Sequence, residues 1–185
     1  MARTLTQLLN SWLHAIARWL RPGVSTPPQP KELDALVDHL AFEVAALESA
    51  ADLFGKHGYW VFLDTSLLHA RLLRDFLWGN PSARFARTEV LAEHYSKTWP
   101  SVRPSLPPVL KLTRKAINAQ LAHISRDRVR PKKVRDLGAD LPNIRDEIRA
   151  GWKAFINNLG ADPRANALCA AVSQNCAALG VPPPP

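Results

Sequence analysis

The sequence lacks the cysteine and histidine patterns of disulfide scaffolds and metal sites. Its 185 residues include two cysteines, Cys169 and Cys176, and no CxxC, HxxxH or HExxH pair. In a helical stretch, a rise of about 1.5 Å per residue sets the backbones of these cysteines about 10 Å apart, too far for a disulfide. We therefore expect two free, buried thiols in a reducing compartment, and neither a metal ion nor another cofactor.

Long hydrophobic runs are also missing. No apolar run approaches the about 20 residues that a membrane-spanning helix needs, so we predict no membrane span. The first residues have periodic apolar positions and no small-residue cleavage site, unlike a signal peptide. Neither a phosphate-binding glycine loop nor a Ser or Cys nucleophile motif is visible. These absences predict a cytoplasmic protein.

Positive charge is what the sequence has in excess. The formal net charge is +8 and the isoelectric point is about 10.0. This balance favours polyanionic partners, either nucleic acid or an anionic membrane surface. The apolar share of 46% and the charged share of 22% are ordinary for a globular protein. The length suits one domain with a real core.

Apolar residues repeat at helical spacing along most of the chain, and no strand pattern of useful length appears. We predict an all-α fold, a bundle of about five to six helices with an appended N-terminal amphipathic helix. The predicted organisation is an N-terminal helix at 1–21, a Pro-rich linker at 22–30, a bundle core at 31–160, and a C-terminal helix with a Pro tail at 161–185. The N-terminal helix either docks on the bundle or lies on a membrane surface.

The helices of the core are delimited by capping and stop residues. We expect helices over 33–54 closed by Gly55 and Gly58, over 59–78, over 90–99, over 108–128, and over 141–159 with Asp140 as cap, Pro142 in the first turn and Gly160 as stop. The helix over 59–78 is apolar nearly all round, which predicts a central position, and its Arg71 and Asp75 are spaced to pair. The Ala-rich helix over 161–179 is expected at the periphery.

The segment most indicative of chemistry lies within the helix over 108–128. His123 lies roughly opposite its main apolar stripe, on a face of small residues that another helix or a second protomer could approach closely. The stretch Asn118-Ala-Gln-Leu-Ala-His123 resembles the signature helix of the HEPN superfamily, in which an Arg is followed, often after a polar residue, by His a few positions later. Residues 67–76 also resemble an early helix of such bundles.

Catalytic HEPN proteins are metal-independent ribonucleases, often homodimers whose Arg–His pairs meet in one cleft. The resemblance implies this fold over 31–160, with His123 as general acid or base on the 2′-hydroxyl or the leaving oxygen of RNA. The family's Arg falls at or just before Asn118, where this sequence has no Arg. Only His123 therefore matches the motif residue for residue, and Asn118 would line the cleft without a fixed charge.

Two further hypotheses concern the neighbours of His123. Arg126 or Arg74 could stabilise the charge that develops on the phosphorus in the transition state. Alternatively, His123 is structural and bonds to a carboxylate such as Asp64 or Asp75.

A basic run covers residues 111–135, where only Asp127 opposes nine cations. This density can bind phosphates in a salt-dependent manner. The candidate nucleic-acid-binding residues are Lys111, Arg114, Lys115, Arg128 and Arg130. Alternatively, the run is a solvated helix end whose cations favour the helix macrodipole. Aromatic residues are not interleaved with it, so base stacking is not indicated.

Three functional hypotheses follow. The first is an RNA-targeting protein of toxin or defence type, either a ribonuclease or an inactive relative, acting as a homodimer. The second is a non-enzymatic helical interaction module, antitoxin-like or regulatory, with a protein partner. The third is a membrane-surface protein that binds through residues 5–20.

Overall fold

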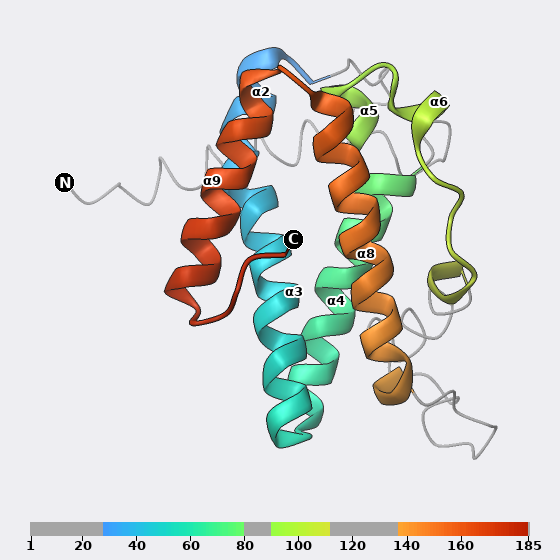
Figure 1. Cartoon of the computed structure of the whole chain (residues 1–185), viewed down its shortest axis with the longest axis vertical. Coiled ribbons are helices and arrows are strands. Elements are labelled where there is room, and N and C mark those ends of the chain that lie inside the picture. The colour runs from blue at the N-terminus through green and yellow to red at the C-terminus, as the bar shows by residue number, and fades with distance from the viewer. Residues whose placement is uncertain (1–27, 80–89, 112–136, 185) are drawn as a thin grey trace, which may run out of the picture.

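The structure is a computed structural model that describes residues 28–79, 90–111 and 137–184. All regular structure in these three ranges is helical, which confirms the all-α class (Figure 1). The predicted N-terminal helix at 1–21 and most of the predicted helix over 108–128 lie outside the described residues, and so do most residues of the linker at 22–30.

Four long helices form the described bundle. They are α3 (Val37–His57), α4 (Trp60–Trp78), α8 (Leu137–Leu159) and α9 (Pro163–Ala178). The main packing partners are α3 with α4, α3 with α9, and α4 with α8 (Figure 1). The short helices α2 (Pro30–Ala35), α5 (Ala92–Tyr95) and α6 (Trp99–Val102) lie at the same end of the bundle in Figure 1.

The predicted helix over 33–54 is two helices in the structure. Pro30 occupies the first turn of α2, and the backbone N–H of Gln29 donates to the carboxylate of Glu32 at 2.7 Å. The chain is interrupted at Leu36 and continues as α3. Gly55 lies inside α3 and does not close it, whereas Gly58 ends the helix with a left-handed φ of 67°.

Helix α4 confirms the predicted helix over 59–78, but its predicted central position is wrong. One face packs against α3 and α8 through residues such as Leu67 and Leu73, while Leu68 and Leu72 on the other face are each 44% exposed. The apolar residues of this face are therefore only partly covered. The predicted pair between Arg71 and Asp75 is present, with nitrogen and oxygen 3.8 Å apart.

The C-terminal half differs from prediction at the start of α8. Helix α8 begins at Leu137, so Asp140 lies in its first turn instead of capping it, and Pro142 lies inside the helix. Helix α9 packs along α3 through a buried face that includes Leu168 and Cys176, and its opposite face is exposed, so its predicted peripheral position is confirmed. Gly160, with φ of 56°, ends α8 as predicted.

Both cysteines are free, as predicted, but only Cys176 is buried and Cys169 is exposed. Burial, and next the nearby Glu48 carboxylate, raise the pKa of the Cys176 thiol. This thiol is therefore protonated at neutral pH and behaves as a small core side chain.

An aromatic cluster holds the segment around α5 and α6 against the bundle. Phe155 of α8 makes edge-on contacts with Phe76, Tyr95 and Trp99, with ring centroids 5.2 to 6.1 Å apart. The Trp99 indole N–H donates to the Leu77 carbonyl at 2.7 Å. The predicted single helix over 90–99 is thus replaced by two short helices whose positions are fixed by these contacts.

Candidate functional site

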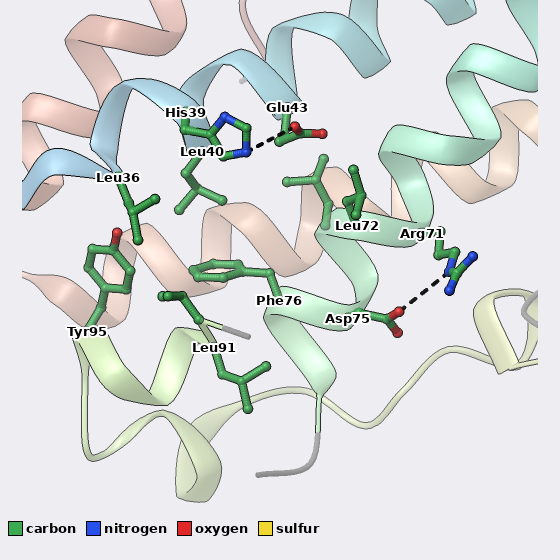
Figure 2. A pocket seen from close by; sticks show the side chains of 12 residues that line it. Leu36, His39, Leu40, Glu43, Arg71, Leu72, Asp75, Phe76, Leu91 and Tyr95 are labelled. Atoms are coloured by element: carbon green, nitrogen blue, oxygen red, sulfur yellow. Dashed lines mark ion pairs between the residues drawn. The ribbon is translucent and has the colours of Figure 1, made fainter. Parts of the chain in front are cut away.

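A half-open pocket of about 360 Å³ lies between α3, α4 and the chain around α5 (Figure 2). Its volume falls at the lower end of ligand pockets, which span roughly 300–1,000 Å³. Most of its lining is apolar, and the principal apolar residues are Leu36, Leu40, Leu72, Phe76, Leu91 and Tyr95. We call this hollow the α3–α4 pocket.

Tyr95 forms one wall of the pocket and is fixed at both ends. Its ring meets Phe76 edge-on at 5.9 Å between centroids, and its hydroxyl donates to the Leu33 carbonyl at 2.9 Å. Burial raises the pKa of Tyr95 to about 12, although Arg164 opposes this shift. The hydroxyl therefore stays protonated near neutral pH and acts as a donor that anchors the wall.

A carboxylate between two histidines lies at one side of the opening. Glu43 is only 8% exposed, and one of its oxygens lies 2.6 Å from Nδ1 of His69 on α4. Its other oxygen lies 3.6 Å from Nε2 of His39, one turn earlier on α3 (Figure 2). Because the carboxylate is an acceptor, we assign the bonding proton to Nδ1 of His69. The contact between Glu43 and His69 joins α3 to α4 beside the pocket.

Charged residues of α4 lie at another side of the opening. Asp75 pairs with Arg71, which also lines the pocket (Figure 2). Asp75 pairs with Arg74 as well. The two carboxylates of the rim, Asp75 and Glu43, thus both have basic neighbours. The rim has no strong charge excess, so the pocket suits an apolar ligand better than a polyanion.

Of the four predicted catalytic residues, only Arg74 lies in the described part of the chain. Arg74 lies on α4 with its side chain 11% exposed and bound to Asp75, and it does not line the pocket. His123, Asn118 and Arg126 lie outside the described residues. The ribonuclease cleft therefore stays a prediction.

Of the predicted nucleic-acid-binding residues, only Lys111 is described. It is exposed in the helical turn over 108–111 that ends this described range, and its backbone N–H donates to the Pro107 carbonyl at 3.0 Å. The other four, Arg114, Lys115, Arg128 and Arg130, lie outside the described residues.

Sequence reasoning missed the cluster of Glu43, His39 and His69. One signal was available, since His39 and Glu43 are four residues apart on one helix. The contact with His69 joins residues 26 positions apart and depends on how α3 and α4 pack.

The described part of the chain contains neither a metal-binding cluster nor a membrane-spanning helix. Across 28–79, 90–111 and 137–184, no three His, Cys, Asp or Glu side chains are placed to hold a metal ion. Within the same ranges, no helix has the length and apolarity needed to cross a bilayer. Comparison of the chain with protein-family models, curated proteins and solved structures finds no match.

Proposed function

We propose that this protein is a helical interaction module whose α3–α4 pocket receives the apolar face of an amphipathic helix from a partner protein. One observation carries this proposal: the apolar pocket continues into an exposed apolar stripe on the same two helices. Phe42 of α3 is 47% exposed, and Leu68 and Leu72 of α4 are each 44% exposed. Leu72 belongs to both the stripe and the pocket lining.

The spacing of this surface matches a helix-in-groove contact. Leu68, Leu72 and Phe76 follow one another at intervals of four residues, which covers about 12 Å along α4. An amphipathic partner helix presents apolar anchors at similar intervals, so it can follow the stripe and place one anchor in the pocket. The paired charges of the rim disfavour a strongly charged ligand and favour this apolar contact.

Site-specific photo-crosslinking tests the proposal. A photoreactive phenylalanine analogue replaces Leu68, and in a matched control it replaces Val102, which is 57% exposed at another surface. We expect position 68 to crosslink to one discrete partner segment with helical apolar periodicity, and position 102 not to do so. A synthetic peptide of that segment should bind at least about tenfold more weakly to Leu72→Glu, since a charge then enters the apolar contact.

Several results would contradict the proposal. Equal crosslinking from positions 68 and 102 would mean that the stripe is not a specific surface. A crosslink to another copy of this chain would identify a dimer interface, and a crosslink within one chain would identify an internal contact. A peptide affinity that Leu72→Glu leaves unchanged would place the binding surface elsewhere.

We also propose, as a second function, that residues 111–135 target RNA. The distribution of charge along the chain supports RNA binding by this segment and not by the bundle. The described residues contain 13 of the 16 acidic residues but only 11 of the 24 Lys and Arg residues. The excess of positive charge therefore belongs to the other segments, including most of the basic run, and a polyanion is best attracted there.

Cleavage of labelled RNA by the purified protein in EDTA tests the ribonuclease form of this second proposal. Metal-free cleavage that is lost in His123→Ala would support His123 as the general acid or base. Equal cleavage by both proteins, or no cleavage, would remove that role and leave RNA binding to be measured separately.

A further inference from the structure

The turn between α3 and α4 carries the most exposed large hydrophobic side chains among the described residues. Trp60 is 74% exposed, and Tyr59 and Val61 are each 63% exposed. The three are consecutive in the sequence. We call this group the α3–α4 tip. An isolated exposed apolar residue is ordinary, but three adjacent ones form a patch that indicates a binding surface.

The fold projects this tip away from the core. Gly58 ends α3 with a left-handed φ of 67°, Tyr59 is extended, and α4 begins at Trp60, so the two helices are joined by a very short turn. In Figure 1 this turn lies at the end of the bundle opposite α2 and α5. It therefore lies far from the α3–α4 pocket, whose walls include Leu36 and Tyr95, and none of the tip residues lines that pocket.

The Tyr59 ring of the tip packs against two neighbouring aromatic rings and stays exposed. Tyr59 stacks on His57 with centroids 5.8 Å apart and an interplanar angle of 13°. Phe62 lies against both rings, at 6.3 Å from His57 and 6.1 Å from Tyr59. These contacts restrain the Tyr59 side chain before binding, so it loses less conformational entropy on binding, which favours association.

We propose that the α3–α4 tip docks on an anionic lipid bilayer, with Tyr59 and Trp60 entering the interfacial layer and Val61 entering beside them. Because the tip protrudes from the bundle, its partner must be able to accommodate protruding side chains. Tyr and Trp have an apolar body with a polar handle, and they are enriched where headgroups meet hydrocarbon.

Charge favours an anionic membrane over a neutral one. No acidic residue occurs between His57 and Leu63, and the next one, Asp64, lies one turn beyond Trp60 on α4, so a shallow insertion of the tip itself buries no carboxylate. The nearest acidic residue before this segment, Asp52, is already paired with Lys56 at 2.6 Å. The whole chain has a net charge of +8, which is carried by residues outside the described ranges and attracts the protein to anionic headgroups. Shallow apolar insertion and electrostatic attraction are the two contributions that together hold peripheral proteins on membranes.

An RNA strand is the competing partner, because bases stack on exposed aromatic rings. Val61, however, cannot stack, and it is as exposed as Tyr59. A mixed patch of two aromatic residues and one aliphatic residue therefore fits the lipid interface better than a series of bases.

Vesicle binding by the full chain tests the proposal. The probes are vesicles of phosphatidylcholine alone and of phosphatidylcholine mixed with phosphatidylglycerol, read by co-sedimentation. We expect binding to the mixed vesicles only, and a loss of about tenfold or more in Tyr59→Ser/Trp60→Ser. The matched control is Val102→Ser, which also removes an exposed apolar side chain (57%) and should bind like the wild type. Thermal unfolding midpoints establish that both variants are folded.

A second measurement keeps the proposal testable if the double variant does not fold. Lipids with a nitroxide in the upper acyl chain should quench the tryptophan emission of the wild type, and Trp60→Phe should remove this quenching while still binding. Absence of binding to the mixed vesicles, or equal binding by wild type and double variant, would overturn the proposal. It would also be overturned if the double variant lost affinity for a single-stranded RNA oligonucleotide but not for vesicles, which would assign the tip to base stacking.

Discussion

The ion pair between Glu48 and Arg149 joins α3 to α8 inside the bundle. The Glu48 side chain is only 4% exposed, and its oxygens lie 2.7 Å from Nε and 2.5 Å from Nη2 of Arg149. This hydrogen-bonded contact is the main reason why the pKa of Arg149 is raised. Removing Arg149 leaves the buried Glu48 carboxylate with only the longer contact to Arg145, at 3.8 Å, and an undercompensated buried charge is the costly event.

We expect Arg149→Met to lower the free energy of unfolding by about 2–3 kcal/mol, less than for a fully buried pair because the arginine is partly exposed. Urea denaturation measures this change. The exposed Lys153→Met, on the same helix, should stay within about 0.5 kcal/mol of the wild type. A variant with Glu48→Leu added to Arg149→Met should recover stability, because the buried carboxylate is then gone. A loss for Arg149→Met no larger than for Lys153→Met would contradict this account.

His94 makes stability depend on pH. Its Nδ1 accepts the backbone N–H of Leu91 at 3.0 Å, a bond that requires the neutral ring. Burial lowers the pKa of His94 from 6.5, with Glu93 opposing the shift. The unfolded chain therefore binds the proton more readily than the folded one, so this contribution to stability is complete above about pH 6.5 and is lost as pH falls below it.

We expect the unfolding midpoint to fall between about pH 7 and pH 5 by a larger amount in the wild type than in His94→Gln. The glutamine oxygen can still accept from Leu91 but does not titrate. Other titrating groups are common to both proteins, so the difference between the two curves reports His94. Parallel curves would exclude His94 as a source of the pH dependence.

At the scale of elements, the sequence predicted the helices where local signals decide them. Apolar periodicity located α3, α4, α8 and α9, and Gly58 and Gly160 both end helices in the left-handed conformation. The errors occur where tertiary contacts decide. Tyr95, 62 residues away, bonds to the Leu33 carbonyl beside the break before α3. The early start of α8 accompanies the burial of Leu137, which no local pattern indicated.

The candidate site was less predictable than the fold. Its walls come from α3, α4 and the chain around α5, and a single sequence shows only pairs within one helix. The pair of Arg71 and Asp75 was predicted from this spacing and is present. The contact of Glu43 with His69 depends on the register between two helices, and the exposure of Leu68 and Leu72 depends on which side of α4 the other helices cover.

The close packing of α4 against α8 depends on a glycine, Gly151, at the point of contact. A Cβ added at Gly151 of α8 would lie within 3.0 Å of three atoms of the Trp78 indole. That indole is itself held by a hydrogen bond of 2.9 Å from its N–H to the Pro104 carbonyl. The ring therefore has little freedom to move, and the two helices can approach closely only because position 151 is glycine.

We expect Gly151→Ala to destabilise the protein by about 1–3 kcal/mol, the usual cost of overpacking. The matched control is Gly55→Ala in α3, where nothing lies within 4 Å of the added Cβ. That change should stabilise by about 0.5–1 kcal/mol, because alanine is the better helix former. Opposite signs in chemical denaturation support the close approach, and stabilisation by both substitutions would contradict it.

At the scale of the whole molecule, the packed bundle and the excess of positive charge belong to different segments of the chain. The described bundle holds most of the carboxylates, many of them in ion pairs such as Asp34 with Arg164 and Glu48 with Arg149. The positive net charge belongs to residues outside the described ranges. Binding of a polyanion and binding of an apolar helix are therefore expected to be separable by mutation.

This separation can be measured through the salt dependence of RNA binding. Each phosphate contact to a single strand contributes about 0.7 to the slope of log affinity against log salt concentration. We expect Arg128→Gln/Arg130→Gln to weaken binding of a single-stranded RNA and to reduce that slope by about 1.4. The control Lys31→Gln/Lys153→Gln removes the same charge from the exposed surface of the bundle and should leave the slope unchanged. If both double variants reduced the slope equally, RNA binding would depend only on the net charge of the protein. The basic run would then be one part of a diffuse positive field, without a site of its own.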